Sequence, residues 1–249
     1  MASELDRARR DRRPVARLTS RHRGMTESDA YACQRRGIDL RIEDGEEVVG
    51  AKLGFTSKAM QDAMGVDSPN YGWLTDRMLV DGDVPMDELI HPKVEPEIAF
   101  VLDDELSGLV DAEAVIGATR SVHACLEVVD SRFEGFSFAA YDNIADNSSA
   151  GLLVMADDGV DPRDLPLDRV GAVMHVDGEV AQTGSGAAAL GHPAEAVAWL
   201  VRRLHASGAS LPAGSIVISG GVTAPADLIR GRRVEIEIDR VGSARLTCT

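Results

Sequence analysis

The chain has 249 residues, of which 44% are hydrophobic and only 4% aromatic, and its formal charge at pH 7 is −15. This length suits one sizeable domain, or one domain with a small appendage, and the apolar share is sufficient for a packed core. So acidic a chain is poorly suited to nucleic acid or an anionic membrane surface, and we expect neither as a partner. An anionic substrate would require a local reversal of charge, which a metal ion provides most simply.

The cysteines and the N-terminus indicate the compartment. The three cysteines are widely spaced and form no CxxC pair, so they offer neither a disulfide framework nor a thiolate metal site. The arginine-rich first 25 residues lack the apolar stretch of a signal peptide, and their acidic residues are unlike a transit peptide. No run of about 18 apolar residues occurs. We therefore expect a cytoplasmic globular protein.

Residues 1–80 are predicted to form an N-terminal helical arm and a cap region packed on the core. After a charged arm over residues 1–23, a helix is expected to begin at Thr26 and to end at Gly37. Further on, the pattern predicts a strand at 46–55, a short helix at 57–64 that ends at Gly65, and a loop at 67–72.

Residues 81–249 are predicted to form a β-rich catalytic domain. A hairpin is expected to turn at Asp177-Gly178. Strands are predicted at 94–102, 124–129, 216–218 and 234–238, and helices at 112–120 and 193–206. Strands outnumber helices and do not alternate regularly with them. The pattern therefore predicts an α+β fold with a rolled or barrel-like sheet, rather than a doubly wound fold.

The most informative segment is the apolar strand at 93–102, which carries Glu95 and Glu97. Residues two apart on a strand point to the same face, so these carboxylates project side by side. They repel each other, and burial disfavours their charged forms, so a divalent cation between them would remove both penalties. Pro96 cannot donate to a sheet ladder and predicts an edge or a bulge. The alternative is that both glutamates face solvent on an edge strand.

A second apolar strand carries Glu127. Three oxygen ligands would leave positions open for water and substrate, which suits Mg²⁺ or Mn²⁺ rather than Zn²⁺. The alternative for Glu127 is a buried ion pair with Arg132 or another cation. Lys52 lies between glycines among apolar residues, where it could bind a substrate carboxylate, move a proton or reach the surface as a solvated lysine. The three glutamates together predict a metal site.

These segments resemble the hydratase and decarboxylase branch of the fumarylacetoacetate hydrolase superfamily, from about Leu18 to the C-terminus. The resemblance is carried by GAKLGFTS at 50–57, YGWLTD at 71–76, HPKVEPEI at 91–98, LEVVDSR at 126–132, ADNSS at 145–149 and LGHP at 190–193. It implies a rolled, mixed β-sheet with flanking helices. It also implies the roles of individual residues: metal ligands Glu95, Glu97 and Glu127, catalytic residues Lys52 and Asp76, and substrate-binding residues Ser149 and Thr223.

The branch acts on 2-oxo acids of meta-cleavage aromatic degradation. Hydrolases of the superfamily have an aspartate as third acidic ligand and a His/Glu pair that activates water, so Glu127 and the lack of such a pair argue against C–C bond hydrolysis. Residues 131–138 and 220–224 resemble decarboxylases, and Phe136 stands where hydratases tend to carry tryptophan. Residues 57–61 resemble hydratases instead, and Leu152 stands where the decarboxylases have arginine.

The resemblance therefore implies a lyase that converts 2-oxohex-3-enedioate (4-oxalocrotonate) to 2-hydroxypenta-2,4-dienoate. Hydration of that dienoate is the first alternative, and a non-catalytic scaffold subunit is the second. The expected partners are a small 2-oxo acid, further copies of the chain in a homo-oligomer, and a sister enzyme of the pathway.

Overall fold

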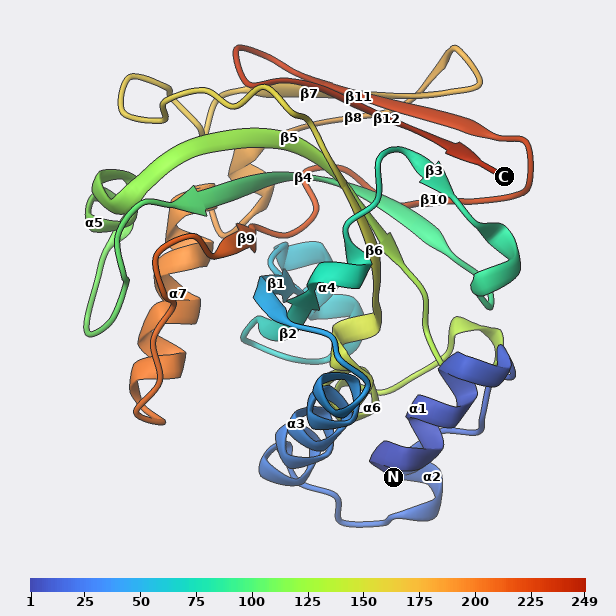
Figure 1. Ribbon diagram of the computed structural model, residues 1–249. Coiled ribbons are helices and arrows are strands. Elements are labelled where there is room, and N and C mark those ends of the chain that lie inside the picture. The colour runs from blue at the N-terminus through green and yellow to red at the C-terminus, as the bar shows by residue number, and fades with distance from the viewer.

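The computed structural model describes all 249 residues and contains two stacked β-sheets with flanking helices (Figure 1). The seven-stranded sheet has the order β2-β1-β9-β4-β5-β6, with β10 paired to β4. Its strands are β1 (Val48–Gly54), β2 (Asn70–Thr75), β4 (Lys93–Leu102), β5 (Thr119–Val129), β6 (Ala150–Met155), β9 (Ile216–Ile218) and β10 (Ala226–Asp227). The five-stranded sheet has the order β3-β12-β11-β7-β8. Its strands are β3 (Asp83–Val84), β7 (Gly171–Val176), β8 (Glu179–Ser185), β11 (Arg233–Ile238) and β12 (Gly242–Cys248).

The seven-stranded sheet is mixed and strongly curved. β1 runs parallel to β9, whereas β4 is antiparallel to both β5 and β9. The long strands β4 and β5 arch beneath the five-stranded sheet, and the segments before β4 and after β5 descend toward the N-terminal helices (Figure 1). The predicted α+β class with a rolled, mixed sheet and flanking helices is confirmed.

The main core lies between the two sheets. Along β11, Val234, Ile236 and Ile238 are buried, while the residues between them face outward. This alternation is the pattern of a sheet with one covered face, because successive side chains on a strand point to opposite sides. The five-stranded sheet thus covers one side of the seven-stranded sheet and exposes its own outer face.

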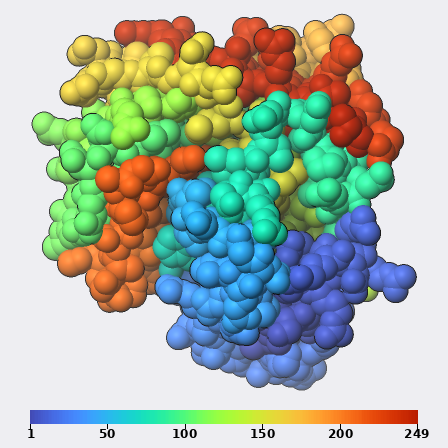
Figure 2. All heavy atoms as spheres, in the orientation of Figure 1, coloured from blue at the N-terminus to red at the C-terminus, as the bar shows by residue number.

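Helices cover the remaining sides. They are α1 (Ala2–Asp11), α2 (Leu18–Arg21), α3 (Glu27–Glu43), α4 (Lys58–Met64), α5 (Ala112–Ala118), α6 (Ala140–Ala145) and α7 (Pro193–His205). Short 3-10 segments lie at Asp76–Met78, Met86–Glu88, Glu134–Phe136, Asn147–Ser149 and Gly186–Ala188. α1, α2, α3 and α6 share a small core of their own, which contains Leu18 and Phe133. Figure 2 shows the N-terminal segment (blue) as a lobe below the sheets.

The prediction that the first long helix ends at Gly37 is wrong. α3 begins as expected with a capping box between Thr26 and Asp29, but it continues to Glu43. A glycine in a helix interior costs only about 1 kcal/mol relative to alanine. Beyond it, Ile38 is buried and Arg41 forms an ion pair with Glu46 at 3.0 Å, so tertiary contacts favour continuation.

The prediction of a loop over 67–72 is wrong in its second half, because β2 begins at Asn70. Asn70 pairs with Gly54 in the β1–β2 ladder, and its side-chain amide donates a hydrogen bond to Asn143 Oδ1 at 2.8 Å. A turn-forming residue is therefore held in a strand by a buried partner far along the chain.

Pro96 does not lie on an edge strand, because β4 pairs with β5 on one side and with β9 and β10 on the other. Its carbonyl accepts a hydrogen bond from Val222 N at 2.9 Å, in the connection between β9 and β10. The N–H and C=O of one residue in an antiparallel strand point to the same side. The missing N–H of Pro96 therefore falls between two short strands, where no ladder bond is required. The prediction of an edge strand or a bulge at Pro96 is therefore wrong, because Pro96 lies instead in a gap between β9 and β10 along an inner strand.

The first 80 residues contribute helices α1–α4 and also strands β1 and β2 of the seven-stranded sheet. Residues 1–80 and 81–249 therefore share one sheet, and their division into an N-terminal cap region and a catalytic domain stays a prediction. None of the helices combines the length and the apolar character needed to cross a membrane.

Candidate active site

A pocket of about 920 Å³ lies against the face of β4 and β1, and helix α4 forms part of its wall. Apolar side chains form much of this wall, among them Met60, Val129, Phe136 and Phe138. The polar groups gather around Lys52 and Glu95 and around the turn at 147–149. The pocket therefore combines a charged end with an apolar body, which is typical of sites for small molecules.

Three glutamates meet at the charged end. Glu95 and Glu97 lie on one face of β4, and Glu127 lies directly opposite Glu95 on β5. One carboxylate oxygen from each of the three lies within 4.8 Å of the others. Glu97 and Glu127 have no exposed surface (0%), while Glu95 is partly exposed and lines the pocket. The alternative that Glu95 and Glu97 face solvent on an edge strand is thereby excluded.

Three of the four carboxylate oxygens of the two buried glutamates accept no hydrogen bond. Glu97 Oε2 accepts a hydrogen bond from Gly220 N at 2.7 Å, but Glu97 Oε1 and both oxygens of Glu127 accept none. Burial raises the pKa of Glu127 to about 7 and that of Glu97 well above its usual value, where the neighbouring Glu127 raises it further. Buried acceptors without partners are rare in folded proteins. A hard divalent cation prefers such oxygen ligands, so this donor set fits a metal ion.

Lys52 is only 2% exposed, so the alternative of a solvated surface lysine is wrong. Its Nζ donates hydrogen bonds to Ser148 O at 3.1 Å and Ser148 Oγ at 3.4 Å. It also lies 3.0 Å from Glu127 Oε2, as an ion pair without the alignment of a hydrogen bond. Burial lowers the pKa of Lys52, but the carboxylates of Glu127, Glu95 and Glu97 more than offset this and raise it. Three carboxylates and one ammonium leave two negative charges, which matches a divalent cation.

The turn over Asn147–Ser149 presents two serines to the pocket. Asn147, Ser148 and Ser149 have φ values of 54°, 53° and 57°, so three consecutive residues adopt the left-handed conformation. Each such residue costs roughly 1–2 kcal/mol, so the surrounding structure must hold the turn. Ser149 Oγ accepts a hydrogen bond from Asn143 Nδ2 at 3.0 Å, and both residues line the pocket.

Arg132 holds both ends of this turn. Its side chain is buried and donates hydrogen bonds to the carboxylate and carbonyl of Asp146 and to the carbonyl of Ala150. Burial raises the pKa of Asp146 to about 6, although the guanidinium acts in the opposite direction. Arg132 therefore pairs with Asp146, and Glu127 takes Lys52 as its cation, the other partner that the sequence left open.

Of the two remaining predicted residues, one lines the pocket and the other does not. Thr223, in the connection between β9 and β10, lines the pocket. Asp76 does not line it: it is exposed and accepts a hydrogen bond from Glu47 N at 2.8 Å, which lowers its pKa. The structure thus brings six of the seven predicted site residues together, and the position of Asp76 gives no support to a catalytic role.

Sequence reasoning singled out neither Lys93 nor Asn143. Further polar residues of the lining to which it gave no role are Thr56, Ser57, Ser148, Thr183 and Ser185. Lys93 lies two residues before Glu95, so the same period that paired Glu95 with Glu97 would have placed it on the pocket face. Asn143 lies in a stretch of short polar side chains, and no local pattern distinguishes it from its neighbours.

Comparison with known proteins agrees with this fold and this cluster of acidic residues. The chain belongs to the fumarylacetoacetate hydrolase family, because residues 56–249 match the model of the fumarylacetoacetate (FAA) hydrolase C-terminal family. It is 38% identical over 250 residues to 2-hydroxyhexa-2,4-dienoate hydratase of Comamonas testosteroni, covering 98% of this chain and 95% of the relative. It is also 38% identical over 242 residues to 4-oxalocrotonate decarboxylase of Pseudomonas sp. (strain CF600), covering 95% and 90%.

Among solved structures, the chain is similar to 4-oxalocrotonate decarboxylase from Pseudomonas putida G7, complexed with magnesium and adipate. The TM-score is 0.95 at 35% sequence identity, and the match covers 100% of this chain and 95% of the other. The resemblance inferred from the sequence motifs is confirmed at the level of the family and its fold.

Proposed function

We propose that this protein is a divalent-metal-dependent lyase that decarboxylates 2-oxohex-3-enedioate to 2-hydroxypenta-2,4-dienoate. The observation that carries the proposal is the cluster of Glu95, Glu97 and Glu127 beside an apolar pocket, in which three buried carboxylate oxygens accept no hydrogen bond: Glu97 Oε1 and both oxygens of Glu127. Relatives with 36–41% identity are named as decarboxylases and hydratases, which are both lyases.

The three glutamates would hold the metal, and Mg²⁺ or Mn²⁺ suits an all-oxygen donor set. The similar decarboxylase complexed with magnesium supports Mg²⁺. When bound, the ion supplies Lewis-acid stabilisation of negative charge that develops on a substrate oxygen. Lys52 adds a fixed positive charge beside the same carboxylates.

Decarboxylation breaks the C5–C6 bond of the substrate, and its electron pair forms the C4=C5 double bond. The C3=C4 electrons move to C2=C3, and the C2 carbonyl becomes an oxyanion that takes up one proton, while CO₂ leaves. Apart from Glu95, the pocket lining contains no aspartate, glutamate or histidine that would activate a water molecule. Hydration of an alkene requires such an activated water, whereas loss of CO₂ does not. Glu95 and Lys52 could serve either reaction, and decarboxylation is favoured by the likeness to the solved 4-oxalocrotonate decarboxylase.

The test is to follow CO₂ release from 2-oxohex-3-enedioate and hydration of 2-hydroxypenta-2,4-dienoate, each with Mg²⁺ and with EDTA. We expect CO₂ release that requires the metal and little hydration. Hydration without decarboxylation would overturn the preferred reaction in favour of the hydratase. Activity that is unaffected by EDTA would overturn the metal requirement.

The second candidate is a 2-hydroxypenta-2,4-dienoate hydratase. It is supported by the 38% identity to the Comamonas testosteroni hydratase, which covers nearly the whole of both chains and equals the identity to the decarboxylase. The same glutamates and Lys52 would serve this reaction, since both reactions pass through an enolic form of a 2-oxo acid. The assays of CO₂ release and of dienoate hydration distinguish the hydratase from the decarboxylase.

Assembly remains part of the proposal. The family resemblance implies a homo-oligomer and a complex with a sister enzyme of the pathway. Light scattering of the purified protein tests the first, and co-purification with that enzyme tests the second.

A further inference from the structure

We propose that Lys93 forms a second anion-binding end of the pocket, which makes the site selective for dicarboxylate 2-oxo acids over monocarboxylates of the same length. The inference rests on the proposed function, because it takes the 2-oxo acid end of the substrate to lie at the three glutamates. It adds a specificity-determining residue at the opposite end.

Lys93 is placed by the strand that carries the glutamates. Lys93, Glu95 and Glu97 alternate along β4, so their side chains leave the same face of the strand. Each step of two residues advances roughly 7 Å along the strand. Lys93 therefore lies one such step beyond Glu95, a separation comparable with the length of an extended six-carbon chain. Both Lys93 and Glu95 line the pocket.

The pocket lining contains two positively charged side chains, Lys52 and Lys93. Lys52 is buried at the glutamate end, where Ser148 and Glu127 engage its ammonium group. Lys93 is thus the cation that remains for a second carboxylate. The pocket wall near Lys93 also includes the apolar side chains of Val129 and Phe136. A carboxylate placed against them would lose bound water, and without Lys93 no hydrogen bond or ion pair would compensate for that loss.

The ammonium group of Lys93 is already positioned by its neighbours. Its Nζ lies 2.5 Å from Asp227 Oδ1 and 5.4 Å from the centre of the Phe136 ring. Phe136 has a φ of 55°, a left-handed conformation that a bulky residue rarely adopts, and its ring packs against His91 with centroids 5.4 Å apart. These contacts place the ammonium group of Lys93 at the pocket wall, beside the Phe136 ring.

Charge and exposure leave this lysine available to a ligand. Its side chain is 32% exposed, and that of Asp227 is 72% exposed, so their ion pair faces water and is weak. An ammonium has three N–H donors, and Asp227 occupies one of them. A substrate carboxylate can use the others or displace Asp227. Asp227 thus competes with the substrate carboxylate for Lys93. Substitution of Asp227 should therefore strengthen the preference for dicarboxylates, whereas substitution of Lys93 should remove it.

The experiment measures binding of 2-oxoadipate and 2-oxohexanoate by calorimetry in the presence of Mg²⁺. These ligands are both six-carbon 2-oxo acids and differ only at C6. We expect the wild-type protein to bind 2-oxoadipate about 10- to 100-fold more tightly, the range for a hydrogen bond to a charged group. Lys93→Met abolishes this preference and leaves the affinity for 2-oxohexanoate unchanged. Asp227→Asn increases the preference.

Further variants control for folding and for bulk charge. Lys93→Gln must lose the preference as Lys93→Met does, which guards against failure of one variant to fold. Arg245→Met, on the outer face of the five-stranded sheet, should leave both affinities unchanged. With 2-oxohex-3-enedioate as substrate, Lys93→Met should raise KM about 10-fold or more without lowering kcat. The C6 carboxylate loses its negative charge as CO₂ leaves, so the contact with Lys93 is stronger in the ground state than in the transition state.

Two results would overturn the inference, and they are distinguishable. If both acids bind the wild-type protein equally and in a metal-dependent manner, Lys93 does not select dicarboxylates, while the proposed function stands. If neither acid binds in the presence of Mg²⁺, the proposed function fails, and the inference fails with it.

Discussion

Strands β4 and β11 have nearly the same sequence pattern, but the glutamates of β4 lie inside the protein and those of β11 lie on its outer face. β4 begins Lys-Val-Glu-Pro-Glu-Ile, and β11 reads Arg-Val-Glu-Ile-Glu-Ile. In β4, Glu95 lines the pocket, and Glu97 on the same face of the strand is fully buried next to it. In β11 the corresponding Glu235 and Glu237 lie on the outer face, in a groove of about 700 Å³. A pair of glutamates on a strand therefore does not by itself mark a functional site.

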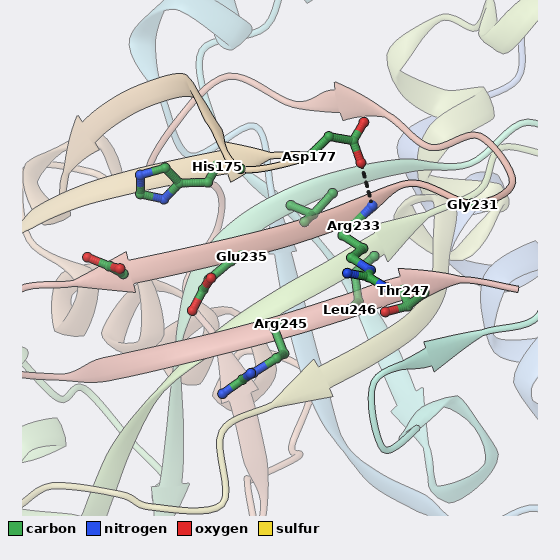
Figure 3. A pocket seen from close by; sticks show the side chains of 11 residues that line it. His175, Asp177, Gly231, Arg233, Glu235, Arg245, Leu246 and Thr247 are labelled. Atoms are coloured by element: carbon green, nitrogen blue, oxygen red, sulfur yellow. Dashed lines mark hydrogen bonds between the residues drawn. The ribbon is translucent and has the colours of Figure 1, made fainter.

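The pocket at β4 and the outer groove at β11 differ in how their charged side chains are solvated. Figure 3 shows the outer groove, where Glu235 and Arg245 extend from neighbouring strands and Asp177 lies beside the backbone of Arg233. These charges are at least partly exposed, so water screens them. At the pocket, by contrast, burial leaves carboxylate oxygens without partners. Unsatisfied and desolvated charge, rather than charge density, distinguishes the candidate active site.

The largest expected effect is a loss of turnover on substitution of a glutamate of β4 but not of its counterpart on β11. Glu97→Gln removes one anionic ligand, and we expect metal-dependent turnover to fall at least about 100-fold, since even partners outside the ligand set change metal affinity 10- to 100-fold. The thermal midpoint without metal should stay the same or rise, because glutamine is neutral, whereas burial of Glu97 without a metal costs the uptake of a proton or the desolvation of a charge. Turnover and thermal unfolding are measured for this variant and for the matched Glu237→Gln on β11, which should match wild type. Metal-dependent turnover that survives Glu97→Gln would contradict the ligand assignment.

The next effect concerns the left-handed turn at the pocket. Arg132→Lys keeps the charge but loses the planar fork that bonds both ends of Asn147–Ser149. We expect kcat to fall about 10- to 100-fold, because displacements near 1 Å have such effects. Mg²⁺ affinity, measured by calorimetry, should change little, since Arg132 contacts none of the three glutamates. Arg245→Lys is the matched control. An equal loss of metal affinity would mean that Arg132 supports the whole site rather than the turn.

The contrast between β4 and β11 also shows how much the sequence could predict. β4 continues as Ile-Ala-Phe-Val-Leu, a run without alternation that indicates burial on both faces, whereas β11 alternates strictly. The glutamate cluster and the rolled sheet were therefore within reach of pattern and family resemblance. The turn at Asn147–Ser149 was not, because its left-handed backbone depends on Arg132, which no local propensity encodes. The position of Asp76 outside the pocket likewise follows from tertiary packing.

Metal addition should stabilise the protein increasingly as pH rises. In the metal-free protein the pKa of Glu127 is raised from 4.5 to about 7, and that of Glu97 is also raised, so the folded state keeps protons that the unfolded chain releases. Their contribution to stability is present below about pH 4.5 and is lost as the pH rises through about 7. A cation displaces these protons and reverses the loss.

Thermal unfolding with EDTA or Mg²⁺ between pH 5 and pH 8 measures this linkage. The gain from Mg²⁺ should be small at pH 5. At pH 8, with Mg²⁺ at about 100 times its Kd, linkage gives about 2.7 kcal/mol, or roughly 5 to 10 °C. Glu237→Gln should show the same pH dependence as wild type. A gain that does not change with pH would mean that the ion displaces no protons from these carboxylates.

The smallest expected effect lies in the outer groove. Arg245 is exposed on β12, opposite Glu235 in the β11–β12 ladder, and its charge faces water in the folded and unfolded states alike. Arg245→Gln should therefore change the free energy of unfolding by no more than about 0.5 kcal/mol and leave turnover and Mg²⁺ affinity unaltered. Denaturant titration and steady-state kinetics measure both. A loss of turnover would show that the solvated charges on β11 and β12 also serve function, because a partner absent from the single chain covers that face. Burial within one chain would then no longer distinguish the pocket from the outer groove.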